Sequence, residues 1–317
     1  MNNTCVALSG GVGGAKLALG LQAVLQPGQL QVIVNTGDDF RHLGLPISPD
    51  VDTLVYTLTD LANPQTGWGL RDETWQFMEQ LERLGGASWF RLGDKDLAMH
   101  LRRATLLDSG LSLTEVTAEL SRRLGVITRV LPMSDTPAPT QIHTTEGLLE
   151  FQDYFVRQQA RPTVTGIAYT ESAAPSPAVQ AALDSDELQA IIVTPSNPWL
   201  SVAPILSLRG FRSSILRRTR PVVAVSPIIA GAAVKGPTAK IMQELGMQPN
   251  SLAIAEFYTG LIDGLVIDRR DSPQQAAIEA LGIPVRLSDT LMNTLEDKTR
   301  LAAEVLEFAA DLRASAV

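Results

Sequence analysis

The sequence of 317 residues predicts an α/β protein with a Rossmann-like, doubly wound and mainly parallel sheet that carries a helical and β-hairpin insertion. Two observations lead to this prediction. Short apolar runs of strand length alternate with segments of helical length, and small polar residues repeatedly follow the apolar runs. Ligands of open parallel sheets bind at the carboxyl ends of the strands, so the same pattern predicts a crevice lined by these polar residues.

The first element combines a strand, a glycine-rich turn and a helix. Residues 5–8 are apolar, residues 9–16 read SGGVGGAK, and a helical pattern continues to residue 21. Backbone N–H groups approach an anion closely where side chains are absent, and a helix N-terminus adds a partial positive charge. A turn that only packs the helix on the sheet explains the glycines equally well. The candidate phosphate-binding residues are Ser9, Gly10, Gly11, Gly13, Gly14 and Lys16.

This turn matches neither of the common phosphate-binding fingerprints. Gly11 and Gly13 form G-x-G, but Lys16 stands where the dinucleotide fingerprint requires glycine. Leu17 stands where a Walker loop requires serine or threonine. The broken dinucleotide fingerprint argues against an NAD-dependent oxidoreductase, which would be a third class of function.

Two acidic pairs follow the second predicted strand. The strand covers residues 30–34, Asp38 and Asp39 come shortly after it, and Asp50 and Asp52 open the next helical pattern. A single aspartate before a helix is ordinarily a cap or a surface residue. The repetition of such pairs indicates Mg²⁺ bound jointly with a phosphate, because this ion prefers hard oxygen ligands. Asp38 and Asp50 are the candidate metal ligands.

The middle of the chain is predicted to be a helical and β-hairpin subdomain, residues 61–174, inserted in a nucleotide-binding core formed by residues 1–60 and 175–317. A polar segment that contains Arg91 interrupts its helices and is a candidate ligand site. The helices expected in this part cover residues 73–84, 97–108 and 112–124, and the strands cover residues 127–131, 141–145 and 148–151.

The remaining sequence continues the alternation of helices and strands. Ser196 and Asn197 follow one buried strand and Ser226 follows the next, so these residues extend the predicted crevice. The strands expected here cover residues 190–193, 222–225, 264–268 and 284–287, and the helices cover residues 178–188, 237–245, 273–281 and 295–313.

Composition excludes several classes of function. A net charge of −8 and a pI of about 5.0 argue against binding to nucleic acid or to an anionic membrane, both of which require clustered cations. Cys5 is the one cysteine and is expected in the core. No apolar run reaches the roughly 18 residues of a membrane-spanning helix, and the N-terminus has no basic region. We therefore expect a cytoplasmic protein without a membrane partner.

Eight segments, in order along nearly the whole chain, resemble the CofD family, the 2-phospho-L-lactate transferases of coenzyme F-420 biosynthesis. Each segment alone is weak, but the ordered set is specific. The segments are LSGGVGGAK at residues 8–16, NTGDD at 35–39, SPDVDT at 48–53, RLGDKD at 91–96, LPMSD at 131–135, FQDYF at 151–155, PSNP at 195–198 and VSPII at 225–229.

The resemblance implies a transfer reaction that requires Mg²⁺. In that family a guanosine-diphosphate-activated phospholactate, or its phosphoenolpyruvate or phosphoglycerate counterpart, donates its phosphoester group to the ribityl hydroxyl of the deazaflavin Fo, and GMP leaves. The resemblance further implies a homodimer in which Asp52 and Arg91 contact Fo. Ser196, Asn197 and the glycine turn would face the guanosine diphosphate part of the donor.

The candidate catalytic residues are Asp38, Asp50 and Asp52. Asp38 and Asp50 would ligate the metal or a water molecule, and one nearby carboxylate would orient the attacking hydroxyl. The sequence contains no motif of a protein nucleophile, which such a transfer does not need. It leaves open which three-carbon acid the donor carries and whether Lys16 contacts a phosphate.

A binding protein without catalysis is the alternative. The YvcK-like regulators, which bind nucleotide sugars, have a similar glycine turn and similar strand-end motifs. Residues 37–40, GDDF, lack the run of glycine and serine associated with that group, and RLGD at residues 91–94 matches the transferases better. A regulator would prefer a uridine sugar nucleotide, whereas a transferase would bind Fo.

Overall fold

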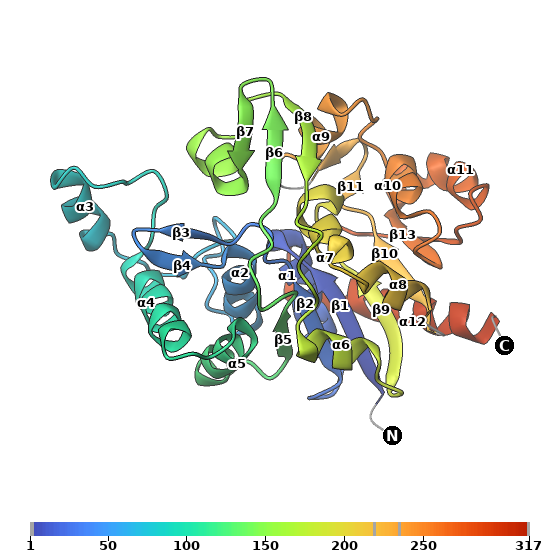
Figure 1. Ribbon diagram of the computed structural model, residues 1–317. Helices are drawn as coiled ribbons and strands as arrows, with labels where there is room; N and C mark the ends of the chain where they lie inside the picture. Colours follow the sequence, from blue (N-terminus) through green and yellow to red (C-terminus); the bar gives the residue numbers. More distant parts are fainter. Residues whose placement is uncertain (1–2, 218–219, 234–235, 316–317) are drawn as a thin grey trace.

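The computed structural model describes residues 3–217, 220–233 and 236–315, and a parallel seven-stranded sheet forms its centre. The strand order is β14-β13-β10-β9-β1-β2-β5 (Figure 1). These strands are β1 (Thr4–Ser9), β2 (Leu30–Val34), β5 (Arg129–Pro132), β9 (Leu188–Val193), β10 (Val222–Val225), β13 (Gly264–Asp268) and β14 (Val285–Ser288).

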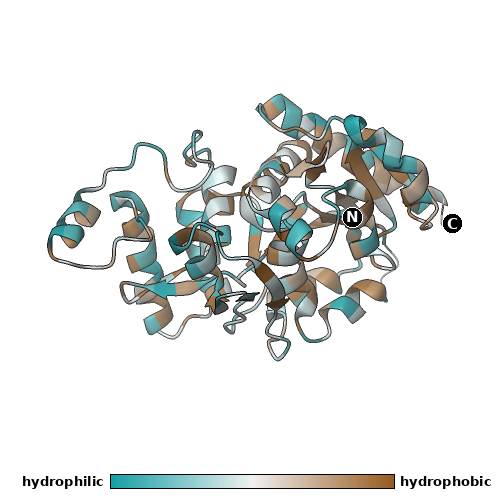
Figure 2. Cartoon of the chain, turned by 90° about the horizontal axis from the view of Figure 1, so that it is seen from above, coloured by the Kyte–Doolittle hydropathy of each residue, from teal (hydrophilic) through white to brown (hydrophobic). Residues whose placement is uncertain are grey.

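Both faces of this sheet are buried, which is why its strands read as continuous apolar runs. Successive side chains of a strand face opposite sides. Val6 and Leu8 of β1 pack into the core on one side, and Cys5 and Ala7 pack into the core on the other. Figure 2 shows the apolar residues concentrated in the central strands and the polar residues on the outer sides of the helices. The predicted doubly wound α/β fold is confirmed.

Helices cover the two faces in separate groups. One face carries α1 (Gly11–Val24), α2 (Pro49–Leu58) and α12 (Leu295–Ser315). The other carries α6 (Pro177–Leu183), α7 (Ala203–Ser207), α8 (Phe211–Leu216), α10 (Ser251–Tyr258) and α11 (Gln275–Glu279). In the described ranges, no helix is long and apolar enough to cross a membrane.

Later strands of the chain lie on both sides of β1 in the sheet. β2 pairs with one side of β1 and β9 with the other, both in parallel. The strand order therefore reverses at β1, and a ligand crevice is expected beyond the carboxyl ends of β1 and β9.

The elements between residues 61 and 174 surround this edge. They are α3 (Gln76–Arg83), α4 (Asp94–Asp108), α5 (Leu113–Arg123) and an antiparallel sheet formed by β6 (Gln141–Thr144), β7 (Gly147–Glu150) and β8 (Val164–Ala168). The same stretch also contributes β5 to the central sheet, where it pairs with β2. In the sequence, α3, α4 and α5 precede this strand, and β6, β7 and β8 follow it.

Several short elements differ from the sequence prediction. The stretch read as a loop before α2 contains a hairpin of β3 (Phe40–His42) and β4 (Leu45–Ile47), whose turn residues Leu43 and Gly44 have φ of 52° and 78°. β8, α7, α8 and α10 were not predicted. The helix expected at residues 178–188 ends at Leu183, and a 3₁₀ turn, Arg269–Gln274, replaces the start of the helix expected at residues 273–281. The remaining short elements are β11 (Ile228–Ile229), β12 (Ala232–Ala233), α9 (Thr238–Glu244) and two π-helical segments, Asp153–Arg157 and Pro198–Val202.

Candidate active site

A cavity of about 680 Å³ opens beyond the carboxyl ends of β1, β9 and β10, at the predicted edge of the sheet. Its wall contains residues of the glycine turn, of both acidic pairs' segments and of the inserted elements. The predicted site residues that line it are Gly10, Gly11, Gly13, Lys16, Asp38, Asp50, Arg91, Ser196 and Asn197. Ser9 and Gly14 pack behind the turn, and Asp52 lies on the side of α2 that faces α4.

The glycine turn has the packing role that its sequence left open, and it also lines the cavity, where phosphate binding stays a prediction. A Cβ atom on Gly13 would lie 2.6 Å from the carbonyl oxygen of Pro195, and one on Gly14 would lie 2.4 Å from the hydroxyl of Ser196. These glycines therefore allow α1 to pack against the end of β9. Gly11 has a φ of +64°, which favours glycine, and Gly11, Val12 and Gly13 of the first turn of α1 line the cavity.

Ser196 fixes the turn to β9. Its hydroxyl accepts a hydrogen bond from Gly10 N at 3.0 Å and donates one to Gly10 O at 2.7 Å. Asn197 begins the next turn, because its Oδ1 accepts from the N–H groups of Trp199 and Leu200 at 2.9 and 3.0 Å. Both residues thus hold the wall of the cavity in shape as well as lining it.

The two aspartates predicted as metal ligands lie together. The side-chain amide of Asn35 donates to Asp38 Oδ1 at 2.9 Å and to Asp50 Oδ2 at 3.0 Å, and all three residues are buried. Asp50 Oδ1 accepts from Gly11 N at 2.7 Å, so the acid pair contacts the glycine turn directly. A single amide therefore sets the positions of both carboxylates.

Burial changes the protonation of this pair. Burial raises the pKa of Asp50 to about 6. The pKa of Asp38 lies well above its usual value, because the side chain is buried and because Asp50 and Asp39 are negative neighbours. Two buried carboxylates that repel each other at the wall of a cavity are a donor set that fits a hard divalent cation.

Lys16 does not extend into solvent. Its Nζ donates to the carbonyl oxygen of Met292 at 2.8 Å, and its side chain lines the cavity together with Leu291 and Met292. Its charge therefore lies at the wall that the glycine turn forms.

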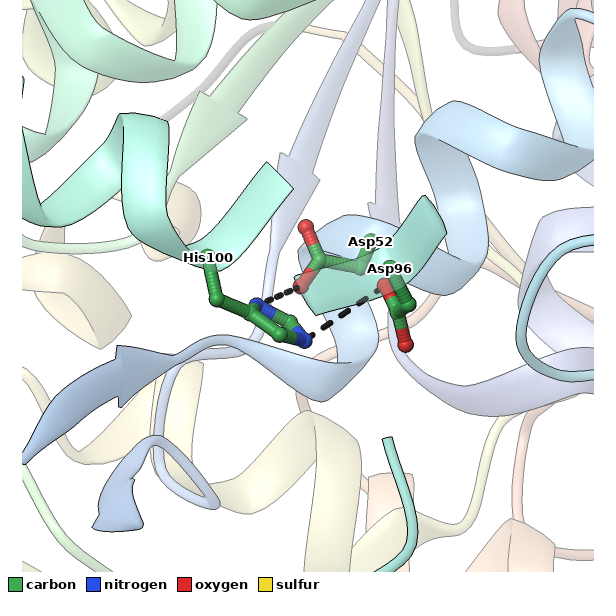
Figure 3. Close-up of side chains that lie close together, drawn as sticks. All are labelled: Asp52, Asp96 and His100. Carbon is green, nitrogen blue, oxygen red and sulfur yellow. Dashed lines mark ion pairs between the residues drawn. The ribbon is translucent and has the colours of Figure 1, made fainter. Parts of the chain in front are cut away.

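Asp52 differs from the other predicted residues because α2 turns it away from the cavity. Arg103 of α4 donates to its Oδ1, and His100 Nδ1 lies 3.7 Å from its Oδ2 (Figure 3). Its side chain does not line the cavity wall in this conformation. The contact of Asp52 with a substrate stays a prediction, and no sequence pattern indicated Arg103 as its partner.

Asp52, Asp96 and His100 form a second group that resembles a metal site. Each offers one ligand atom, and these atoms lie within 4.8 Å of one another. The guanidinium of Arg103, however, donates to both Asp52 and His100 Nδ1. A cation placed there would face this buried positive charge, so the Asp38 and Asp50 pair fits a metal better.

Aromatic side chains form a further part of the cavity wall, together with Arg91. The guanidinium of Arg91 lies 4.4 Å from the ring centroid of Trp75. Phe151 and Phe155 are stacked at 5.5 Å with an angle of 14°. The sequence indicated Arg91 and the segment FQDYF separately, but loop aromatics cannot be assigned to a common surface without the fold. The aromatic residues that line the cavity are Trp68, Phe90, Phe151 and Phe155.

Comparison with known proteins assigns the chain to a family. Residues 5–305 match the family described as 2-phospho-L-lactate transferase CofD. The chain belongs to the CofD family. It is 38% identical over 304 residues to the 2-phospho-L-lactate transferase of Methanosarcina mazei, covering 95% of this chain and 99% of that protein. It is also 38% identical over 317 residues to the phosphoenolpyruvate transferase of Kitasatospora aureofaciens, covering 97% of this chain and 98% of that protein. The protein is thus a transferase of the CofD type.

Among solved structures, a UPF0052 family protein from Bacillus halodurans has a similar fold. It aligns with a TM-score of 0.62 at 16% identity, over 96% of this chain and 99% of that chain. The likeness supports the α/β fold of the CofD-type chain.

The acid pair predicts a pH-dependent stability that Asp50 controls. The folded-state pKa of about 6 lies above the ordinary value of 3.8, so the folded protein holds a proton that the unfolded protein releases. As the pH rises from about 4 to about 7, this group should lower the free energy of unfolding by roughly 3 kcal/mol, since one pKa unit corresponds to about 1.4 kcal/mol.

Denaturant unfolding of the wild type and Asp50→Asn in the presence of a chelator measures this effect. The variant should show a smaller fall in stability with rising pH, because the contribution of Asp50 is lost and that of Asp38 remains. Asp60→Asn is the control, because the Asp60 side chain is 92% exposed, and it should keep the wild-type dependence. Equal pH dependence in the wild type and Asp50→Asn would contradict the assignment.

Proposed function

We propose that the protein transfers a phospholactyl-type group from its guanosine-diphosphate-activated donor to the ribityl hydroxyl of the deazaflavin Fo, releasing GMP, in coenzyme F-420 biosynthesis. One observation carries the proposal: a single cavity joins the glycine turn and the acid pair to an aromatic wall that contains Arg91. The printed names of the relatives support the transfer of a phosphorylated three-carbon acid.

The glycine turn is proposed to hold the diphosphate of the donor. The first turn of a helix offers N–H groups without acceptors inside the helix, and these favour an anion. Asp50 uses the N–H of Gly11, and the turn continues along the cavity wall through Val12 and Gly13. Lys16 adds a positive charge at the same wall. The guanosine would extend toward Ser196, Asn197 and the end of β10.

Asp38 and Asp50 are proposed to hold Mg²⁺ beside this diphosphate. Both carboxylates face the cavity and are fixed by Asn35. Mg²⁺ bound there would neutralise the charge that develops on the phosphate of the departing GMP. A bound divalent cation would also favour the ionised carboxylates, against the effect of burial.

The aromatic wall is proposed to hold the acceptor. A tricyclic deazaflavin offers two flat apolar faces, which stack on aromatic side chains at centroid distances of about 4.5–7 Å. Phe90, Phe151 and Phe155 present such rings, and Arg91 adds a hydrogen-bond donor held over Trp75. The ribityl chain would then run from this wall toward the acid pair.

The proposed chemistry needs no covalent intermediate on the protein. The Fo hydroxyl attacks the phosphorus that carries the three-carbon acid, in line with the bond to the bridging oxygen of the diphosphate. The new oxygen–phosphorus bond forms, the bond to the bridging oxygen breaks, and GMP leaves with that electron pair, while the proton of the hydroxyl passes to a nearby carboxylate. Positioning and charge neutralisation can carry such a transfer. A carboxylate near the hydroxyl, in the acid pair or at Asp52, orients it.

The donor acid is proposed as a class. Relatives named for phospholactate and for phosphoenolpyruvate are both 38% identical to this chain, so overall similarity does not separate them. Phospholactate, phosphoenolpyruvate and phosphoglycerate donors share the guanosine diphosphate part that the glycine turn would bind. We further propose a cytoplasmic homodimer, as the family resemblance implies.

The transfer assay tests this function. The protein is incubated with Fo, Mg²⁺ and each of the three guanylylated acids, and GMP and the product are detected by mass. Product should form with at least one donor. Asp38→Asn and Asp50→Asn should each lower kcat/KM by about 100-fold, the scale of lost electrostatic stabilisation, whereas the exposed control Asp60→Asn should not.

Two results would contradict the proposal. Absence of product with every donor would remove the transferase assignment for these substrates. Tight binding of a uridine sugar nucleotide without Fo binding would instead favour the nucleotide-sugar-binding regulator.

Arg91 provides a separate prediction for the acceptor end. Arg91→Ala should raise the KM for Fo by about 10-fold, the equivalent of roughly 1.4 kcal/mol, because it removes one donor and one face of the wall. The affinity for GDP should stay unchanged, since the guanidinium of Arg91 contacts Trp75 rather than the glycine turn. Arg83→Ala, at an exposed position of α3, is the matched control. An unchanged KM for Fo would remove Arg91 from the acceptor site.

A further inference from the structure

A row of buried polar side chains joins α2 to α4. Asp52 and Tyr56 lie one turn apart on α2, and Asp96, His100 and Arg103 follow one another along one face of α4. We name these five residues the α2–α4 seam. Figure 3 shows His100 between the carboxylates of Asp52 and Asp96. The Tyr56 hydroxyl donates to Asp96 Oδ1 at 2.6 Å, which closes the row at the end nearer the start of α4.

The hydrogen bonds of the seam have a defined direction. A guanidinium has no acceptor atom, so in the 3.0 Å contact between Arg103 and His100 Nδ1 the arginine is the donor. The histidine proton therefore sits on Nε2, which faces Asp96 Oδ1 at 3.4 Å. Arg103 also donates to Asp52 Oδ1 and to the carbonyl oxygen of Pro46 in β4. These directional bonds depend on the relative position of α2 and α4, because Arg103 and His100 lie on α4 and Asp52 lies on α2.

Burial of this seam is expensive for a purely structural contact. Arg103 is 1% exposed and is among the largest fully buried side chains. Two apolar side chains of similar volume often hold helices together as firmly as a buried ion pair, without its desolvation cost. What the directional ion pair adds is a fixed register between the two helices.

This register is transmitted to the cavity by the ends of both helices. Asp50, in the first turn of α2, precedes Asp52 by two residues, and Arg91 lies just before α4. The start of α4 is also tied to the segment that carries Trp75. Glu73 accepts from the N–H groups of Lys95 and Asp96, each at 2.8 Å. Arg91 and its stacking partner are therefore bound to the same end of α4.

We propose that Arg103 and His100 are positioning residues for the transfer. They hold the carboxylate of Asp52 and fix the register of α4 on α2, and thereby set the position of Arg91 relative to Asp50 across the cavity. The inference rests on the proposed function for its kinetic consequence, whereas the register itself can be measured without substrate.

Arg103→Met and Arg103→Lys test the proposal, with Arg102→Met as the matched control because Arg102 is exposed on the same helix. The measurements are backbone hydrogen exchange, the affinity for GDP, and kcat and KM for Fo. The double variant Asp52→Asn/Arg103→Met removes both buried charges together. It replaces Arg103→Met in the same measurements if that variant does not fold.

Arg103→Met should exchange hydrogen about 10-fold faster in residues 89–97 than the control, because the start of α4 loses its fixed register. The KM for Fo should rise by about 10-fold or more, since displacements of about 1 Å can cost up to 100-fold. GDP affinity should stay within about twofold of the wild type because the glycine turn lies outside the seam. Arg103→Lys keeps the positive charge but not the forked guanidinium. Its hydrogen exchange and its KM for Fo should therefore lie between those of the wild type and Arg103→Met.

Two outcomes would overturn the proposal. A lower melting temperature with unchanged KM for Fo would show that Arg103 only stabilises the fold. Hydrogen exchange in residues 89–97 equal to that of Arg102→Met would show that the seam does not set the register. If the wild type transfers no group to Fo, the proposed function fails. The comparison of hydrogen exchange between Arg103→Met and Arg102→Met still tests whether the seam sets the register of α4 on α2.

Discussion

The close contact between the turn after β1 and the end of β9 is the constraint on which the site depends. The hydroxyl of Ser196 forms hydrogen bonds with both the N–H and the carbonyl of Gly10. The same hydroxyl lies so close to Gly14 that a Cβ atom would not fit there. This contact aims the first turn of α1 at the cavity. Asp50 then bonds Gly11, which brings α2 and its carboxylate to the same place. Phosphate binding, metal binding and helix packing would thus share one set of backbone groups.

α2 divides the acidic side chains between two tasks. Asp50 faces the cavity with Asp38, whereas Asp52 faces α4 and is bonded by Arg103. Their separation follows from helical geometry, because residues two apart on a helix point in different directions. The helix therefore links the proposed metal site to the inserted elements that carry the aromatic wall, and the two ends of the cavity keep a defined separation.

The sequence could predict the central sheet because strands buried on both faces are continuous apolar runs, as in β1 and β9. It could not predict β8 or the β3–β4 hairpin, which are short and depend on neighbouring strands. The position of Asp38 and Ser196, which follow β2 and β9, is expected from the rule for parallel sheets, whereas Asp50 reaches the same place from the first turn of α2. The direction of Asp52 could not be predicted, because it depends on Arg103, 51 residues away along the chain. The core and insertion boundaries stay a prediction.

A crystal structure of the protein with GDP and Mn²⁺ tests the central claim most directly, since the anomalous signal of Mn²⁺ locates the ion independently of the density for the nucleotide. We predict one Mn²⁺ between Asp38 and Asp50, and the diphosphate against the N–H groups of the first turn of α1. Mn²⁺ among Asp52, Asp96 and His100, or a diphosphate bound away from Gly11 and Gly13, would contradict the account.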